Sequence, residues 1–306
     1  MNQTFHAHGK LLLTGEYFVL DGALALALPV KLGQSLTVST KVYPKNELRW
    51  QSLDHTGTCW FEAVFLPKTF ECRHSSDEVV ADRLQKIFAQ AKVLNPELTT
   101  NYLELTTALS FPREWGLGTS STLVYLIAKW AQVDAFELQF RTFGGSGYDI
   151  ACAGAEGPVL YRLENGRPAV ERCSFKPAFS QHLYFVYLGK KQDSREGIAR
   201  YRRQGGTGRQ ADIANATALT RRMATSGNLA DFEKVVREHE NLISQALDIK
   251  RAKSLYFSDF WGEIKSLGAW GGDFVLATSE QPEDETRRYF NEKGHSVFLP
   301  YDELVL

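Results

Sequence analysis

The stretch "EWGLGTSST", residues 114–122, places two glycines and four hydroxyl side chains directly before an apolar helical pattern. Glycine lets backbone N–H groups approach a ligand because it has no Cβ, and the start of a helix offers N–H donors and partial positive charge. The pattern predicts a loop that wraps a polyphosphate while one hydroxyl binds Mg²⁺, a cation that prefers oxygen. A glycine turn followed by a Ser/Thr N-cap is the alternative, and neither the Walker pattern nor a complete GxGxxG is present. The residues of this glycine and hydroxyl loop are Gly116, Leu117, Gly118, Thr119, Ser120 and Ser121.

Two further glycine-rich loops contain a carboxylate. In "FGGSGYDIA", residues 143–151, Asp149 follows Ser146 and Gly147, and in "SLGAWGGDFVLATS", residues 266–279, Asp273 follows Gly271–Gly272. A positioned carboxylate can orient or deprotonate an attacking hydroxyl, which is the chemistry that phosphoryl transfer requires. Alternatively, Asp149 is a helix N-cap and Asp273 bonds a nearby amide within its turn.

Basic residues stand near these loops or form a cluster of their own. Lys10 lies just before the apolar run "LLL", and its ammonium would hold a nearby carboxylate ionised and offset charge on a transferring phosphoryl group. Between residues 190 and 222 there are nine Lys or Arg against three Asp or Glu. Such a cluster suits a phosphorylated or carboxylate-bearing acceptor, whereas the alternative for it, as for Lys10, is solvated charge.

Regular elements are expected on both sides of each loop. Alternating residues predict strands in "QSLTVSTKVYP", "ELRWQSLDHTGTCWFEAVFLP", "NYLELTTALSFP", "PVLYRL" and "HLYFVYLGKK". Capping and helical periodicity predict helices within "SSDEVVADRLQKIFAQAKVLNP", ending near Pro96, at Thr119–Phe140, over "DIACAGA", and at about 194–226, 229–247 and 282–293. Strand and helix alternate in both halves, which indicates an α/β or α+β protein with two lobes joined near residues 165–180.

Composition narrows the class of protein. The chain has 306 residues with 43% hydrophobic content and a formal net charge of -1, so no global field attracts nucleic acid or a membrane. Its four cysteines are scattered without a CxxC pair, which indicates reduced thiols. Neither a secretory signal nor an apolar run of membrane-spanning length is visible, so a cytoplasmic protein is expected.

The motifs "AHGKLLLTGEYFVLDG", "WGLGTSST", "SGYDIA" and "GAWGGDFVLA" occur in an order that resembles the GHMP kinases, from about Phe5 to Thr278. "GEYFVL", "GGSGYD" and "GGD" together look more like phosphomevalonate kinases than galactokinases, and "GYDIA" resembles a subgroup associated with the mevalonate pathway. The resemblance implies an α+β fold with a left-handed βαβ crossover in an N-terminal lobe, residues 1–170. A ferredoxin-like C-terminal lobe, residues 171–306, would follow, with ATP and acceptor meeting between the lobes.

The resemblance also implies roles for individual residues. Asp149 matches the family's catalytic aspartate and Lys10 its motif-one lysine. The resemblance makes Gly116–Ser121 the predicted ATP loop, which binds the triphosphate, with Ser120 as the ligand of Mg²⁺. Substrate contacts are expected from Glu16, Tyr17, Ser146, Gly147, Ser194, Arg195, Gly271, Gly272 and Asp273.

Two positions depart from the family pattern, and a third bears on its metal site. His8 stands where the family has a proline, and Trp270 takes the place of a glycine, so that its ring would stack on a ligand or pack against the first lobe. Glu137 is the only acid near the place where some mevalonate kinases have a second magnesium ligand.

The resulting prediction is a kinase that depends on ATP and Mg²⁺ and acts on a mevalonate-pathway acceptor, with phosphomevalonate favoured over mevalonate. A sugar or homoserine kinase of the same fold and an inactive nucleotide-binding homologue are the alternatives. Its expected partner is a small-molecule acceptor, in a monomer or homodimer.

Overall fold

The computed structural model describes residues 2–40, 47–98, 100, 103–189, 194–204, 209–268, 270 and 273–306. The chain folds into two compact units. Unit 1 comprises Met1–Gly9, Leu32–Arg113 and Leu117–Gly154, and unit 2 comprises Lys10–Lys31, Glu114–Gly116 and Ala155–Leu306. These units cross the predicted lobe boundary at residue 170, because residues 10–31, 114–116 and 155–170 belong with the C-terminal part of the chain.

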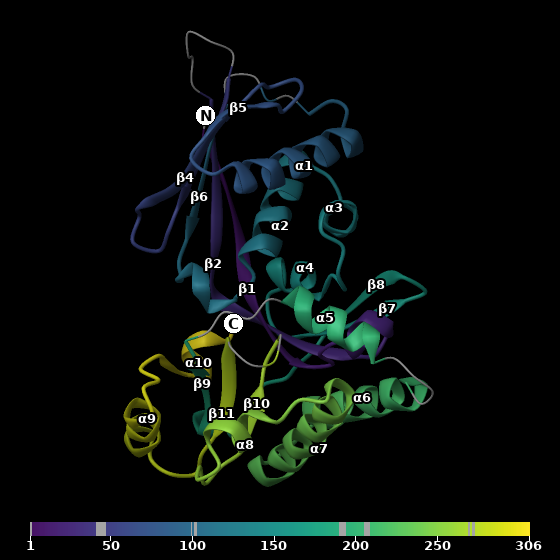
Figure 1. Ribbon diagram of the computed structural model, residues 1–306, viewed down its shortest axis with the longest axis vertical. Coiled ribbons are helices and arrows are strands. Elements are labelled where there is room, and N and C mark those ends of the chain that lie inside the picture. The colour runs from purple at the N-terminus through teal and green to yellow at the C-terminus, as the bar shows by residue number, and fades with distance from the viewer. Residues whose placement is uncertain are drawn as a thin grey trace. The chain divides into compact units, whose positions relative to one another are not determined.

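Unit 1 is built on a twisted, mainly antiparallel sheet in the order β5-β4-β3-β6-β2 (Figure 1). The β3–β4 hairpin follows the predicted alternation and turns at Asp54–Thr58, where the Asp54 carboxylate accepts from the Thr56 and Thr58 amides. Strands β3 and β6 run parallel, so the chain between them must cross over, as the resemblance implies; the hand of that crossover stays a prediction. The strands are β1 (Asn2–Thr14), β2 (Ala25–Thr40), β3 (Leu48–Leu53), β4 (Cys59–Phe65), β5 (Cys72–Ser75) and β6 (Leu103–Leu109).

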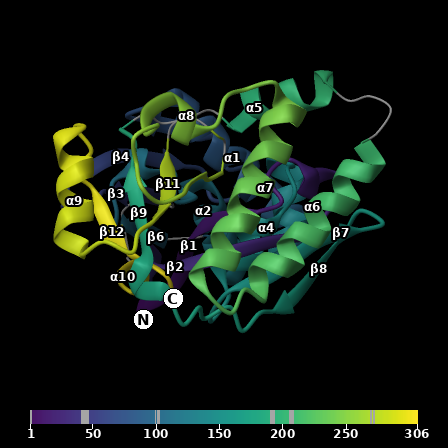
Figure 2. The ribbon, with the colours of Figure 1, turned by 90° about the horizontal axis from the view of Figure 1, so that it is seen from below.

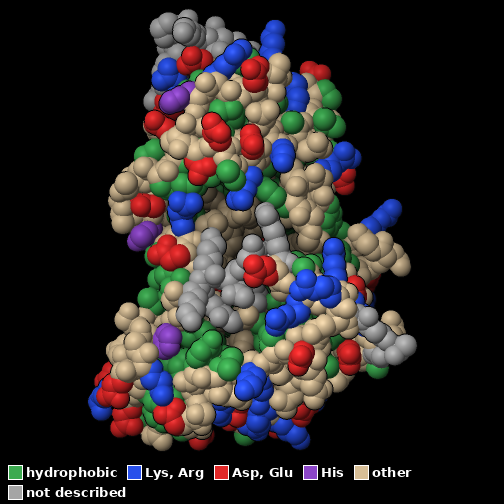
Figure 3. Space-filling view, viewed as in Figure 1, with side chains coloured by type: hydrophobic (Ala, Val, Ile, Leu, Met, Phe, Trp, Pro, Cys, Tyr) green, Lys and Arg blue, Asp and Glu red, His purple; other side chains and the backbone are tan. Residues whose placement is uncertain are grey.

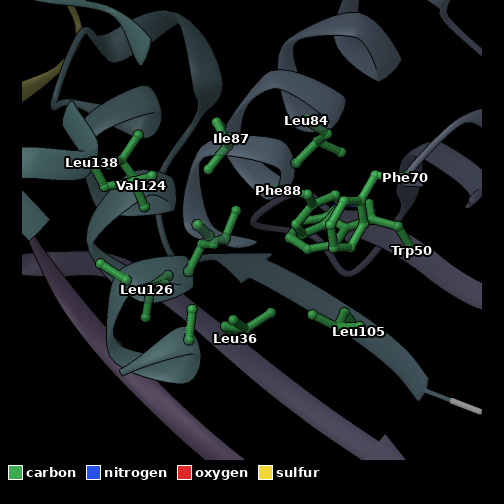
Figure 4. Close-up of a cluster of buried hydrophobic side chains, with 14 of the residues drawn as sticks. Leu36, Trp50, Phe70, Leu84, Ile87, Phe88, Leu105, Val124, Leu126 and Leu138 are labelled. Carbon is green, nitrogen blue, oxygen red and sulfur yellow. The ribbon is translucent and has the colours of Figure 1, made fainter. Parts of the chain in front are cut away.

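Helices pack on this sheet and form the core of unit 1. The Asp77 carboxylate caps the first helix, and the apolar stripe of that helix inserts Phe88 between Trp50 and Phe70 (Figure 4). Its ring meets Trp50 edge-on at 5.6 Å and stacks on Phe70 at 5.4 Å, geometries that favour aromatic pairs. The helices are α1 (Glu78–Leu94), α2 (Thr119–Ala131), α3 (Ala135–Thr142) and α4 (Tyr148–Ala153), with a short 3₁₀ turn at Arg113–Trp115.

Unit 2 contains a second, fully antiparallel sheet in the order β10-β11-β9-β12. This strand order is that of a ferredoxin-like fold, and the helices before β10 and after β11 stand where that fold has its two helical connections. Unit 2 also holds the first part of β2, where Ala25–Ala27 pairs with β7, and a 3₁₀ turn at Phe18–Asp21. Its strands are β7 (Val159–Glu164), β8 (Arg167–Arg172), β9 (Leu183–Tyr187), β10 (Ile264–Ser266), β11 (Phe274–Thr278) and β12 (Phe298–Pro300).

Helices α6 and α7 lie side by side in unit 2 (Figures 1 and 2), and α7 also packs on β10. A second core forms on the ferredoxin-like sheet around Tyr184, Phe257, Phe290 and Phe298. The helices are α5 (Ser194–Arg203), α6 (Arg209–Ala224), α7 (Leu229–Leu247), α8 (Ala252–Tyr256), α9 (Glu283–Glu292) and α10 (Tyr301–Leu304), with a 3₁₀ turn at Ser180–His182.

Two predicted helices are in fact interrupted. The helix expected over Thr119–Phe140 ends at Ala131, because Gln132 adopts a left-handed conformation with φ 56° and Asp134 caps a new helix through the Glu137 amide. The helix expected at 194–226 is divided into α5 and α6, and residues 205–208 between them lie outside the described residues. Among the described residues, no helix has both the length and the apolar character needed to cross a membrane.

Candidate active site

The predicted ATP loop opens α2 in unit 1. Gly118 is the N-cap residue, with φ 96°, and no side chain among the described residues caps the helix, so the alternative of a Ser/Thr N-cap does not hold. The hydroxyls of Ser121 and Thr122 bond inward, both to the Gly118 carbonyl and Thr122 also to Gln34, whereas Ser120 is exposed. The helix start therefore leaves its amides to other acceptors and presents one hydroxyl to solvent, as an anion site requires.

The predicted catalytic aspartate begins a helix in the same unit. Gly147 is the N-cap of α4, with φ 89°, and Asp149 lies in the first turn, half-buried. Asp149 is therefore not the cap, which removes its simplest structural role. Helix α4 packs against α2, and Ser146 is buried just before it.

In unit 2, three predicted motifs meet at one glycine. The Lys10 ammonium, near the end of β1, donates to the Gly116 carbonyl at 3.2 Å. A Cβ on Gly116 would overlap the carboxylate of Asp273, which would have to shift, and Gly116 has φ 68°, a backbone conformation that favours glycine. The carbonyl of Asp273 accepts from the Leu188 amide at 2.8 Å, which extends the β9–β11 pairing to Asp273.

Glu16, predicted to contact substrate, is fully buried in a charged cluster. Its Oε1 lies 2.6 Å from Lys265 Nζ, and its Oε2 lies 3.4 Å from His239 Nε2. Glu240 lies 3.7 Å from the same ammonium and accepts from the amide and hydroxyl of Ser266. We call Glu16, His239, Glu240 and Lys265 the buried charge cluster; all four side chains are fully buried.

Burial dominates the proton affinities in the cluster. It raises the pKa of Glu16, and Lys265 opposes this effect. For the same reason the pKa of Glu240 rises to about 7. Burial, and then the charge of Lys265, lower the pKa of His239 well below its usual value, so the ring is neutral and its Nε2 accepts from the Gly15 amide at 3.1 Å. The cluster therefore ties the turn after β1 to α7 and β10 within unit 2.

Tyr17 is held in a strained conformation beside this cluster. Its φ is 62°, in a region that costs non-glycine residues about 1–2 kcal/mol. Its ring packs on Tyr201 with centroids 5.8 Å apart, and a Cβ on Gly197 would overlap its hydroxyl. Glycine at 197 thus allows α5 to pack directly on Tyr17.

The predicted site residues divide between the units. Unit 1 holds Leu117, Gly118, Thr119, Ser120, Ser121, Ser146, Gly147 and Asp149, and unit 2 holds Lys10, Glu16, Tyr17, Gly116, Ser194, Arg195, Gly271, Gly272 and Asp273. Ser194 and Arg195 begin α5, but their side chains, like all of Gly271 and Gly272, lie outside the described residues. Sequence reasoning missed Lys265, His239 and Glu240, because nothing in "EIKSL" or "EHENL" distinguishes these charged residues from solvent-exposed ones.

The comparisons with known proteins agree with this architecture. No protein-family model and no curated protein matched the sequence. Among solved structures, phosphomevalonate kinase from Streptococcus pneumoniae, in complex with phosphomevalonate and AMPPNP, superimposes with a TM-score of 0.69 at 17% identity, covering 96% of this chain and 97% of that one. The chain has the GHMP kinase fold. The α+β class predicted from the sequence is thereby confirmed.

Two other structures show how widely this fold is shared. Mevalonate kinase from L. major, in complex with R-mevalonate, has a TM-score of 0.66 at 17% identity, over 95% of this chain and 90% of that one. Galactokinase from Lactococcus lactis, complexed with galactose, has a TM-score of 0.69 at 11% identity, over 96% and 89%. Proteins that differ in their bound ligands thus match this GHMP kinase fold equally well, so the likeness does not select an acceptor.

Proposed function

We propose that this protein is an ATP-dependent kinase that transfers the γ-phosphoryl group to the hydroxyl of a small acceptor, with phosphomevalonate favoured over mevalonate. The observation that carries the proposal is the meeting of Lys10, Gly116 and Asp273, which come from three motifs far apart in the chain. The kinase fold and the open amides at the start of α2 support it independently.

In this proposal each motif has a distinct task. The amides at the start of α2 bind phosphate oxygens, and Asp149 orients or deprotonates the acceptor hydroxyl. Lys10, held by the Gly116 carbonyl, supplies positive charge to offset the charge of the transferring group. Asp273 packs against Gly116, the first glycine of the predicted ATP loop.

Magnesium is part of the proposal, and the exposed hydroxyl of Ser120 fits as its protein ligand. The described residues contain no group of three or more His, Cys, Asp or Glu placed to bind a metal ion. Glu137 forms a salt bridge with Arg141 at 2.7 Å, which favours a structural role for it. Bound Mg²⁺ would neutralise phosphate charge, with nucleotide oxygens as most of its ligands.

An acceptor screen tests the proposal directly. ADP release would be measured with mevalonate, phosphomevalonate, homoserine and galactose, using the full chain and Asp149→Ala as the matched inactive variant. Turnover with phosphomevalonate above the other three supports the proposed acceptor. Turnover with galactose or homoserine would support another kinase of the fold, and tight ATP binding without ADP release from any acceptor would support an inactive homologue.

A further inference from the structure

A pocket of about 640 Å³ lies within unit 2, beside the turn after β1. Tyr17 and Trp270 form part of its wall, α5 contributes a second wall, and the end of α7 with α8 contributes a third. Its size suits a small organic ligand. The pocket therefore joins Tyr17, Trp270 and part of the basic cluster to residues after α7 and in α8 that the sequence did not single out.

One side of the pocket is positively charged. Glu196, Ala199, Arg200 and Arg203 line it at helical spacing i, i+3, i+4 and i+7, so they share one face of α5. Lys250 adds a third cation from the segment after α7. Basic side chains gather over α5 in the space-filling view (Figure 3).

The rest of the lining is apolar and aromatic. The aliphatic residues Leu247, Ile249, Ala252 and Leu255 contribute to it, and Tyr256 lies beside them. Leu255 and Tyr256 are 50% and 43% exposed, an unusual placement for side chains of this size. A polyol such as a hexose would find few hydrogen-bond partners on this wall, whereas a hydrocarbon chain would bury apolar surface there.

Trp270 closes the inner side of the pocket. Its backbone has φ 50°, a conformation that favours glycine, which is the residue that the family resemblance places here. The side chain is nevertheless only 4% exposed. Among the described residues its N–H has no partner within hydrogen-bond distance. The chain therefore accepts a strained backbone in order to place a large ring between the pocket and the buried charge cluster.

We propose that this pocket binds an organic anion with a hydrocarbon body, that Arg200 and Arg203 hold its phosphate or carboxylate group, and that Trp270 sets the depth of the pocket. The identity of this ligand as the acceptor rests on the proposed function. The chemistry of the lining then favours a phosphorylated, aliphatic acceptor over a sugar.

Calorimetric titration of the full chain, without ATP, tests whether Arg200 and Arg203 hold the anionic group of the ligand. The probes are phosphomevalonate, galactose and inorganic phosphate, and the variants are Arg200→Gln, Arg203→Gln and Arg202→Gln. Arg202 is an exposed residue of the same helix outside the lining, so it controls for net charge. We expect the Kd for phosphomevalonate to rise about tenfold or more in the first two variants and to stay within about twofold in the third. Equal effects in all three, or tighter binding of galactose than of phosphomevalonate, would overturn the proposal.

The proposal that Trp270 sets the depth of the pocket is tested by Trp270→Gly and Trp270→Phe, with Tm measured for each variant. We expect the glycine variant to bind phosphomevalonate at least about tenfold more weakly and the phenylalanine variant to stay within about threefold. Equal weakening in both variants at unchanged Tm would contradict the wall and assign the effect to the indole N–H.

Kinase assays on the same variants separate this inference from the proposed function. Binding that depends on Arg200 and Arg203 without ADP release from any acceptor would keep the pocket assignment and reject the kinase. ADP release whose KM for the acceptor is the same in Arg200→Gln, Arg203→Gln and Arg202→Gln would keep the kinase and reject the pocket.

Discussion

The Lys10 ammonium donates to the carbonyl oxygen of Gly116 at 3.2 Å, across 106 positions of sequence. The carboxylate of Asp273 fills the space next to the same glycine, so the motifs that contain Lys10, Gly116 and Asp273 meet there within unit 2. A cation, a backbone loop and a carboxylate are thus fixed with respect to one another before any ligand binds. Such preorganisation is what electrostatic stabilisation of a transferring phosphoryl group requires.

Gly116→Ala should disturb the contacts of residue 116 with Lys10 and Asp273. The left-handed backbone costs alanine about 1–2 kcal/mol, and the overlap with Asp273 adds about 1–3 kcal/mol. We expect a lower free energy of unfolding in urea together with loss of kinase turnover. Gly166→Ala is the matched control, because Gly166 has φ 75° but open space around it, so it reports the backbone cost alone. Equal losses of stability in the two variants would show that the Asp273 carboxylate moves away freely.

Asp149→Ala should lower kcat by orders of magnitude while the affinity for ATP and the Tm stay nearly unchanged. The reason is structural: Gly147, and not Asp149, is the N-cap of α4. Asp134→Ala provides the opposite control, since the Asp134 carboxylate caps α3 by accepting from the Glu137 amide at 2.7 Å. That variant should lose about 1 kcal/mol of stability and keep its kcat. If Asp149→Ala lowers Tm as much as Asp134→Ala does, a structural role for Asp149 is supported instead.

Much of the fold was predictable because its signals are local. Asp77 before an amphipathic stripe predicted α1, and alternation predicted the β3–β4 hairpin. The break between α2 and α3 was missed because Gln132 carries no glycine or proline signal, although Asp134 was a readable cap.

The sequence predicted the residues of the candidate site only where a motif marks them. Lys10, Gly116 and Asp273 were all named, and the structure brings them together. The buried charge cluster could not be foreseen, because Lys265 pairs with Glu16 from 249 positions away and nothing beside either residue encodes that pairing. A charged side chain is buried only when a partner compensates its charge, and a partner this distant in sequence is brought near only by the tertiary structure.

Lys265→Met should be strongly destabilising, by about 3–5 kcal/mol, because it leaves the carboxylates of Glu16 and Glu240 buried without their cation. Urea unfolding at neutral pH measures the loss. Lys293→Met is the control, since Lys293 pairs with an exposed Asp259, and its effect should be far smaller. The double variant Lys265→Met/Glu16→Gln should recover part of the loss. If the double variant is no more stable than the single one, the loss does not come from the uncompensated charge of Glu16.

Glu240 should make stability fall as pH rises from about 4.5 to about 7. Its folded pKa of about 7 lies above the usual value of 4.5, so in this window the folded state holds a proton that the unfolded state has released. The unfolded state therefore binds fewer protons, and rising pH favours unfolding by up to about 3 kcal/mol. His239 acts in the opposite sense, because its lowered pKa makes stability fall as pH drops below 6.5.

The variant Glu240→Gln isolates the contribution of Glu240. Its amide oxygen can still accept from Ser266, and the contribution of His239 cancels in the difference from the natural chain. We expect the variant to gain stability relative to the natural chain as pH rises through this window, measured by urea unfolding between about pH 5 and pH 8. A difference that stays constant with pH would mean that Glu240 is ionised in the folded protein throughout, held so by Lys265.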